Sequence, residues 1–288
     1  MDFKKTATLI MVEQTLFALP FAYLGLLFAG GGTVVQWLWV TVALVAGRTA
    51  GMSFNRVIDA AIDAKNPRTR DRAVPAGEVS RRDVWILAVV SCCIMMGASY
   101  MLNELCFYFS FIAVLLLFTY SYFKRFTAAS HLYLGVVEAA APVGGYIAVT
   151  GSFSSLGGID VLPFLLGIAI MCWIGGLDII YSFLDEEFDS REGLFSIPSK
   201  YGREKARIIS SALYVAAFAA LVLAGIMTRR GIAYWVSLMC VGLIFFQQQR
   251  LGRREDIEAA VRELFQMNAF VSPVLFAGMF IDVFFRIM

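Results

Sequence analysis

The chain has 288 residues, of which 59% are hydrophobic and only 16% are charged, and its mean hydropathy is +0.73. Soluble domains carry about 25% charged residues, so this composition excludes an ordinary soluble protein and predicts an integral membrane protein. The formal net charge is +2, and the cations flank apolar runs rather than forming a basic soluble module, so nucleic-acid binding is not expected.

Apolar windows of about twenty residues, long enough to cross a hydrocarbon core as a helix, recur along the whole chain. The strands of a membrane barrel are excluded because these windows do not alternate polar and apolar residues. We therefore expect an all-α polytopic membrane protein with a single domain, residues 1–288. The nine predicted spans lie at residues 13–31, 35–58, 84–102, 105–123, 130–150, 161–183, 208–228, 231–249 and 268–288.

Lysines and arginines are distributed unevenly between the two sides of this predicted bundle. If the spans alternate in direction, only Arg229, Arg230 and Arg286 lie on one side, whereas nearly all the others lie on the opposite side. By the positive-inside rule the crowded side is cytoplasmic. We therefore expect a multi-pass protein of the inner (cytoplasmic) membrane, with its N-terminus inside and its C-terminus outside.

A first acidic stripe ends the second predicted span, in the stretch SFNRVIDAAIDAKNPRTRDRAVPAG. Asn55, Asp59 and Asp63 recur every four residues, which places them on one face of a helix near its cytoplasmic end. An aspartate at the centre of a span raises the free energy of membrane insertion by about 2.5 to 3.5 kcal/mol. A cluster of such residues therefore indicates a function.

A second acidic stripe ends the sixth predicted span, in WIGGLDIIYSFLDEEFDSREGLFSIPSKYG. Asp178, Tyr181, Asp185 and Asp189 recur there at steps of three and four residues, again at the cytoplasmic end. One stripe alone is consistent with a solvated helix end paired with arginines. Two stripes that face the same compartment favour a shared site.

The residue types at these stripes favour a hard metal ion. Like charges spaced four apart repel, so such stripes persist best when cations neutralise them. All five cysteines lie in predicted spans without zinc-ligand spacing, which indicates packing, and the single histidine, His131, is expected to have a helix-end role rather than a catalytic one. Oxygen ligands remain, and they suit Mg²⁺ bridged by a diphosphate.

Basic residues follow both stripes and the fourth predicted span. Guanidinium and ammonium groups beside a bound metal can hold phosphate oxygens, although some are explained equally well by the positive-inside rule. The candidate phosphate-binding cations are Arg68, Arg72, Lys124, Arg125 and Lys200.

Both stripes resemble the aspartate-rich motifs of the UbiA superfamily of intramembrane prenyltransferases. The first motif is matched by NRVIDAAIDAKNPRTRDRAVPAG and the second by DIIYSFLDEEFDSREGLFSIP. The stretch SYFKRFT is similar to the family's loop after the fourth span, and the resemblance extends over nearly the whole chain. Many members have an aspartate directly after the motif asparagine, where this chain has Arg56, so the first metal loses one candidate ligand.

The resemblance implies a bundle around a central cavity, in which two Mg²⁺ ions hold a prenyl diphosphate between the motifs. Asn55, Asp59 and Asp63 would bind one metal, and Asp185 and Asp189 the other. Asp178 and Tyr181 would lie deeper and contact the substrate. The four motif aspartates would assist ionisation of the allylic diphosphate, and the Tyr181 ring would face the resulting cation; the catalytic candidates are Asp59, Asp63, Tyr181, Asp185 and Asp189.

The implied acceptor is an aromatic acid. The first span, VEQTLFALPFAYLG, resembles a bacterial subgroup described as 4-hydroxybenzoate polyprenyltransferase-like, which includes enzymes of menaquinone synthesis that use a dihydroxynaphthoate. Both acceptors, and hence ubiquinone and menaquinone biosynthesis, stay open. Glu138, within the fifth span, is either a cavity residue or a protonated helix–helix contact.

Other functions remain compatible with two acidic stripes. Haem-side-chain and lipid-glycerol prenyltransferases of the same family would use the same metal site with another acceptor. A divalent-cation transporter would be a different class, but it should place its carboxylates near the midplane on broken helices. The carboxylates of this chain lie at one membrane face, beside candidate phosphate-binding cations.

Overall fold

The protein is described from a computed structural model, which covers residue 9, residues 12–155 and residues 158–285. Nearly all regular structure in this part of the chain is helical, apart from one antiparallel pair of two-residue strands. The elements are α2 (Val12–Phe28), α3 (Val34–Ile58), α4 (Ala60–Asp63), α5 (Arg81–Leu102), α6 (Glu104–Phe123), α7 (Ser130–Thr150), β1 (Ser154–Ser155), β2 (Gly158–Ile159), α8 (Leu162–Tyr181), the 3₁₀ turn η1 (Ser182–Leu184), α9 (Glu186–Glu192), α10 (Ile197–Met227), α11 (Ile232–Leu251) and α12 (Ile257–Phe284).

The expected helical membrane bundle is confirmed, with one approximation. Within the described residues, eight helices are long and apolar enough to cross a membrane, and α2 contributes a shorter apolar stretch, Phe17–Phe28. The count of nine spans is therefore approximate, and the chain is a multi-pass membrane protein. The last three residues of the ninth expected span, 286–288, lie outside the described part.

Two helices begin earlier than the hydropathy windows predict. Helix α10 begins at Ile197, where Ser196 and Ser199 form a reciprocal capping box, and α12 begins at Ile257, where Asp256 accepts a hydrogen bond from the Ala259 amide. Both added segments are polar, so an apolar window does not detect them, whereas side-chain caps satisfy their first amides. These extensions place helical turns on the same side of the bundle as the two acidic stripes, residues 55–63 (the first acidic segment) and residues 178–189 (the second acidic segment).

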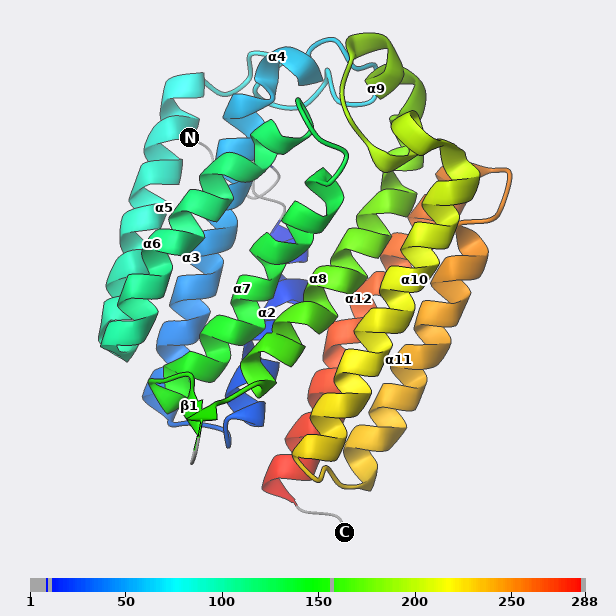
Figure 1. Cartoon of the computed structure of the whole chain (residues 1–288). Coiled ribbons are helices and arrows are strands. Elements are labelled where there is room, and N and C mark those ends of the chain that lie inside the picture. Colours follow the sequence, from blue (N-terminus) through cyan, green and yellow to red (C-terminus); the bar gives the residue numbers. More distant parts are fainter. Residues whose placement is uncertain (1–8, 10–11, 156–157, 286–288) are drawn as a thin grey trace.

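The helices run roughly side by side, and the short elements gather at the two ends of the bundle (Figure 1). Helices α4 and α9 lie together at one end, and the β1 hairpin and the end of α12 lie at the other (Figure 1). Helices α2 and α7 approach very closely, because a side chain at Gly25 would meet the Pro142 carbonyl oxygen at 2.0 Å and one at Gly145 would meet the Ala22 carbonyl oxygen at 2.0 Å. Small residues allow such contact between membrane helices.

Helix α10 contains one break, at Gly202, whose φ of 79° and ψ of 160° are not helical. Glycine adopts a positive φ without the steric cost that a side chain brings. The turn before the break, Ile197–Tyr201, therefore has its own direction. Its first amide, that of Ile197, donates a hydrogen bond to Nε2 of His131 on α7 at 3.1 Å.

Candidate active site

The first acidic segment is interrupted at Asp59, the middle one of its three motif residues. Helix α3 ends at Ile58, Asp59 has non-helical dihedrals (φ −91°, ψ 0°), and α4 ends at Asp63. The expected face of one continuous helix is therefore broken at Asp59. Asn55, one turn earlier, donates through Nδ2 to Oδ2 of Asp59 at 2.8 Å, so the two side chains still lie together.

The second acidic segment is interrupted in the same way. Helix α8 ends at Tyr181, the turn η1 follows, and Asp185 has dihedrals of −109° and 2° before α9 begins. Asp189 lies in α9, and its amide donates to the Asp185 carbonyl oxygen at 2.7 Å. A short helix therefore carries the last aspartate of each segment.

Cations neutralise three of the four motif aspartates. Nζ of Lys124 lies 2.8 Å from Oδ2 of Asp59, and Nη1 of Arg72 lies 2.9 and 2.8 Å from the two carboxylate oxygens of Asp63. Arg68 forms a bidentate ion pair with Asp185. The cations predicted from the sequence as phosphate ligands therefore contact the carboxylates predicted as metal ligands.

Arg68 also joins the two segments. It follows the first segment, yet its Nη1 donates to the Tyr181 hydroxyl at 2.7 Å, in addition to the pair with Asp185. Asn66 supports the same contact, because its Nδ2 donates to Oδ1 of Asp185 at 2.9 Å and its Oδ1 accepts from the Arg68 amide at 2.9 Å. Asn66 was not identified from the sequence. Its position in NPRTRDR gives no signal, since its partner is 119 positions away.

Asp59 is the most enclosed of these carboxylates, with 2% of its side chain exposed. Burial raises the pKa of Asp59, and the nearby charge of Lys124 opposes this effect only in part. Its Oδ1 atom is buried without a hydrogen-bond partner, and the closest guanidinium nitrogen of Arg125 is 3.5 Å away. Burial likewise raises the pKa of Asp189. Burial therefore disfavours the ionised form of both carboxylates, and a positive charge close to them favours it.

A polar cavity of about 250 Å³ lies between the two segments. It brings together ten of the twelve site residues expected from the sequence, which are Asn55, Asp59, Asp63, Arg68, Arg72, Lys124, Asp178, Tyr181, Asp185 and Asp189. The other two do not line it. Arg125 donates instead to the Ile58 carbonyl oxygen at 2.7 Å, and the Lys200 ammonium lies 5.4 Å from the Tyr201 ring centroid.

A second, larger cavity of about 1490 Å³ adjoins the polar one. Its lining is mostly apolar and comes from α2, α3, α5, α6, α7, α8 and α12. Both cavities share the side chains at their junction, which are Asn55, Arg68, Arg72, Tyr120, Leu134, Asp178 and Tyr181. Arg56, which stands where the family motif often has aspartate, is buried and lines only the larger of these two cavities.

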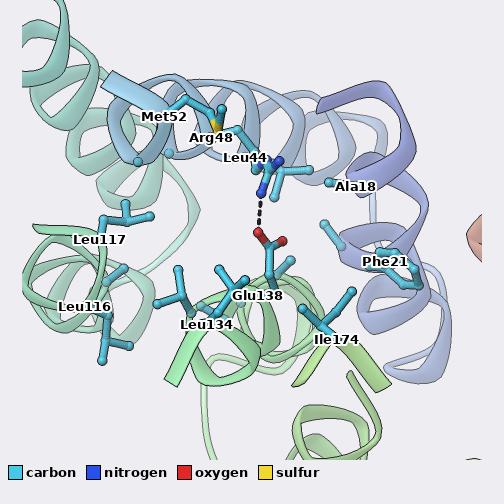
Figure 2. A pocket seen from close by; sticks show the side chains of 18 of the residues that line it. Ala18, Phe21, Leu44, Arg48, Met52, Leu116, Leu117, Leu134, Glu138 and Ile174 are labelled. Carbon is cyan, nitrogen blue, oxygen red and sulfur yellow. Dashed lines mark hydrogen bonds and ion pairs between the residues drawn. The ribbon is translucent and has the colours of Figure 1, made fainter. Parts of the chain in front are cut away.

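One ion pair crosses the larger cavity. Figure 2 shows Arg48 of α3 and Glu138 of α7 pointing toward each other among apolar side chains such as Leu134 and Ile174. Nε of Arg48 is buried without a hydrogen-bond partner. Glu138 is therefore a cavity residue, which is one of the two roles expected from the sequence. Arg48 was not predicted from the sequence, because its partner is 90 positions away.

His131 is also part of this site, which the sequence did not indicate. Its side chain is buried, lines the polar cavity and forms a hydrogen bond through Nδ1 to Oδ2 of Asp178 at 2.7 Å. Its Nε2 accepts the Ile197 amide hydrogen. The expected helix-end location is correct, since α7 begins at Ser130, but the contact with Asp178 depends on the packing of α7 against α8.

The residues around the polar cavity fit a divalent metal by their chemistry. In the described part of the chain, no three carboxylate, histidine or cysteine side chains converge as a metal site, and three of the motif aspartates are paired with cations. The donors are nevertheless hard oxygens on both sides of one cavity, and Oδ1 of Asp59 has no hydrogen bond to lose. Such donors suit Mg²⁺ or a similar cation.

Comparison with known proteins gives one consistent result. A profile of the UbiA prenyltransferase family matches residues 18–271. Two similar curated proteins are named 4-hydroxybenzoate octaprenyltransferase. The one from Shewanella pealeana is 29% identical over 277 residues, covering 96% of this chain and 91% of that protein, and the one from Aeromonas hydrophila subsp. hydrophila is 30% identical over 283 residues, covering 97% and 93%.

Solved structures agree with the fold. The apo structure of a UbiA homolog from Aeropyrum pernix K1 superposes with a TM-score of 0.86 at 33% identity, covering 94% of this chain and 98% of that chain. A UbiA homolog from Archaeoglobus fulgidus, bound to GPP and Mg²⁺, has a TM-score of 0.67 at 16% identity, covering 96% of this chain and 99% of that chain, which supports the fold alone. The resemblance noted in the sequence is therefore confirmed, and the chain belongs to the UbiA prenyltransferase family.

Proposed function

We propose that this prenyltransferase transfers a polyprenyl chain from a polyprenyl diphosphate to 4-hydroxybenzoate, in quinone biosynthesis. The acceptor is supported by the names of relatives that cover nearly the whole chain. The observation that carries the proposal is the junction of the two cavities. A polar cavity suited to a charged head opens into an apolar cavity of about 1490 Å³, larger than the roughly 300 to 1,000 Å³ of most ligand pockets.

The polar cavity would hold the diphosphate together with Mg²⁺. Asn55, Asp59 and Asp63 would hold one ion, and Asp185 and Asp189 the other. A diphosphate and two divalent cations nearly cancel each other's charge, so the ion pairs of this site can exchange partners with little change in net charge. The carboxylates would then be available to hold the metal, and the freed cations would be available to bind phosphate oxygens.

Arg68, Arg72, Lys124 and Arg125 are the cations proposed to stabilise the departing diphosphate. Bound Mg²⁺ supplies Lewis-acid stabilisation of the leaving oxygens. As the allylic carbon–oxygen bond breaks, its electron pair stays with the diphosphate, and the cationic side chains around the cavity stabilise that charge. The Tyr181 ring, which lies at the junction of the cavities, is positioned to face the allylic cation.

Arg48 is the group best placed to select an acceptor that carries a carboxylate. It lies inside an otherwise apolar cavity, and its Nε has no hydrogen-bond partner. A guanidinium can hold a carboxylate through two parallel hydrogen bonds. An aromatic acid bound to Arg48 would replace part of its contact with Glu138 and present its ring toward the junction, whereas a neutral acceptor would leave the ion pair unchanged.

We further propose that the acidic segments face the cytoplasm. Residues 64–83, 190–206 and 250–267 comprise loops and helix ends on the same side as α4 and α9 and carry most of the basic residues, whereas Arg229 and Arg230 lie between α10 and α11 at the other end. Single cysteines placed in these loops should resist labelling by a membrane-impermeant reagent in intact cells. Strong labelling there would reverse the orientation and leave the site intact.

A direct assay tests the proposed reaction. Purified protein is incubated with a radiolabelled polyprenyl diphosphate, with and without Mg²⁺, and with 4-hydroxybenzoate, a dihydroxynaphthoate, or benzyl alcohol as a neutral control. We expect prenylated 4-hydroxybenzoate only when Mg²⁺ is present. Transfer to the dihydroxynaphthoate alone would reassign the acceptor, and failure to transfer to any aromatic acid would contradict the proposed function.

A further inference from the structure

Asp178 occupies a position that no other carboxylate in the described part of the chain shares. It lines both the polar and the apolar cavity, whereas the motif aspartates line only the polar one and Glu138 lines only the apolar one. The reacting carbon of a prenyl diphosphate must lie at this junction, because it joins the charged head to the apolar chain. Asp178 is therefore the carboxylate nearest to the place where the acceptor ring is attacked.

Within the part of the chain that the structure describes, the Asp178 carboxylate is paired with no lysine or arginine. Its one hydrogen bond within the described residues runs from Oδ2 to Nδ1 of His131, and 28% of its side chain is exposed. By contrast, Asp59, Asp63 and Asp185 are each paired with a lysine or an arginine, and Glu138 is paired with Arg48. The Asp178 carboxylate can therefore contact the substrate without first breaking an ion pair with a lysine or an arginine.

The tautomer of the neutral His131 ring follows from its two hydrogen bonds. Nε2 accepts the Ile197 amide hydrogen, so it carries no proton, and the ring proton must be on Nδ1. Nδ1 therefore donates to Oδ2 of Asp178. This contact fixes the orientation of the carboxylate, whose Oδ1 forms no hydrogen bond with the described residues, and the Ile197 amide at the beginning of α10 fixes the imidazole in turn.

We propose that Asp178 is the base that accepts the acceptor's ring proton and that His131 is the residue that positions it; this inference rests on the proposed prenyl transfer. Ionisation leaves an allylic cation and diphosphate. The aromatic ring forms a carbon–carbon bond to that cation. The carboxylate then removes the proton from the substituted ring carbon, and the carbon–hydrogen electron pair restores aromaticity. The proton passes to the released diphosphate, because Asp178 also lines the cavity that holds it.

The test compares the Asp178→Asn variant with the parent protein, using 4-hydroxybenzoate that carries either hydrogen or deuterium at the ring carbon that is prenylated. We expect kcat to fall by about 10²-fold or more, the usual contribution of a general base, and a primary isotope effect to appear that the parent lacks. Affinity for the prenyl diphosphate should stay unchanged in a binding assay. Glu187→Gln, whose side chain is exposed on α9, serves as the control.

Two substitutions of His131 separate positioning from structural support. His131→Asn keeps an amide donor near the Nδ1 position but cannot reach Ile197, whereas His131→Gln keeps an acceptor for Ile197 but loses the donor to Asp178. We expect Asn to retain most of the kcat and Gln to show both a lower kcat and the isotope effect. The opposite ranking would assign His131 a purely structural role and overturn its part of the proposal.

The outcomes for Asp178 are equally distinct. An Asp178→Asn variant that binds the diphosphate and transfers within about two-fold of the parent would refute the assignment, since a general base contributes far more. A large loss of kcat without an isotope effect would also refute it, because the defect would then precede proton removal. If the parent protein itself binds the diphosphate but prenylates no acid, the proposed function fails before Asp178 is tested.

Discussion

The two aspartate-rich segments follow the same backbone course but differ in how their charges are compensated. Each segment leaves the helical conformation at an aspartate, Asp59 or Asp185, and each continues in a short helix that carries a second aspartate four residues later. In both, the amide of the later aspartate donates to the carbonyl oxygen of the earlier one, at 2.8 and 2.7 Å. This shared geometry directs two pairs of carboxylates into one cavity.

The segments differ in enclosure. Asp59 has 2% of its side chain exposed and is held by Lys124 from the loop after α6, whereas Asp185 has 16% exposed and is held by Arg68, which follows the first segment. Asp189 has no ion pair within the described residues. The two aspartates of the first segment are therefore buried and paired with Lys124 and Arg72, which come from the same half of the chain. In the second segment, the charge of Asp185 is neutralised by Arg68, a residue that follows the first segment. The comparison predicts which substitutions the two segments tolerate.

The largest effect is expected when either central aspartate loses its charge. Asp59→Asn and Asp185→Asn keep side-chain size but remove one preorganised electrostatic group, so each should lower kcat by at least about 10²-fold in the presence of Mg²⁺. Asp71→Asn is the control, since Asp71 lies in the loop after the first segment with 90% of its side chain exposed. Near-normal prenyl transfer by either folded variant would show that its segment does not bind the diphosphate.

A smaller effect is expected on stability from the unequal enclosure. Lys124→Met leaves the buried Asp59 carboxylate without its closest cation, so the free energy of unfolding in metal-free detergent should fall by about 2 kcal/mol. Lys65→Met removes a cation of similar type from the exposed pair with Glu192, which should cost less than about 1 kcal/mol. Thermal unfolding of both variants measures how much stability each one loses. Equal losses of stability would contradict the stronger dependence of the buried Asp59 on its cation.

The geometry of the two arginine pairs predicts a further difference. Arg68 holds Asp185 through Nε and Nη2, whereas Arg72 contacts both oxygens of Asp63 through the single Nη1 atom. Lysine offers one nitrogen and cannot reproduce a bidentate contact. Arg68→Lys should therefore lower kcat/KM by about tenfold, and Arg72→Lys by much less, as about 1.4 kcal/mol corresponds to tenfold. Similar losses in both variants would argue that charge alone matters at these positions.

The smallest effect is expected at Lys200. The sequence indicated it as a phosphate ligand because it follows the second segment, but in the structure it lines neither of the two cavities and lies over the Tyr201 ring. Surface substitutions away from a site usually change stability by less than about 0.5 kcal/mol. Lys200→Gln should accordingly keep KM for the prenyl diphosphate within about twofold of the parent. A larger increase in KM would restore Lys200 as a ligand.

Hydropathy and periodicity predicted the helical bundle because both depend on nearby residues. The four-residue spacing of Asp59 and Asp63, and of Asp185 and Asp189, was sufficient to group these carboxylates, even though the backbone breaks at the first member of each pair. Those breaks were not predicted, because the spacing of the side chains continues through them. The polar beginnings of α10 and α12 were not predicted, because an apolar window does not include polar turns.

Contacts between distant segments were not predictable from the sequence. Asn66 bonds to Asp185 across 119 positions, and Arg48 pairs with Glu138 across 90. His131 stands alone as the chain's one histidine, and its contact with Asp178 arises only when α7 packs against α8. Each of these residues has an ordinary local explanation in the sequence, and tertiary structure alone brings each one to a cavity.

A double-mutant cycle tests most directly whether the two segments hold one diphosphate. The Mg²⁺-dependent release of diphosphate is measured for Asp59→Asn, Asp185→Asn and the double variant, with folding monitored by thermal unfolding. Because both residues would act in one cluster, the double variant should lose much less activity than the product of the two single losses. Losses that multiply, with both variants folded, would mean that the segments act independently and would contradict the shared site.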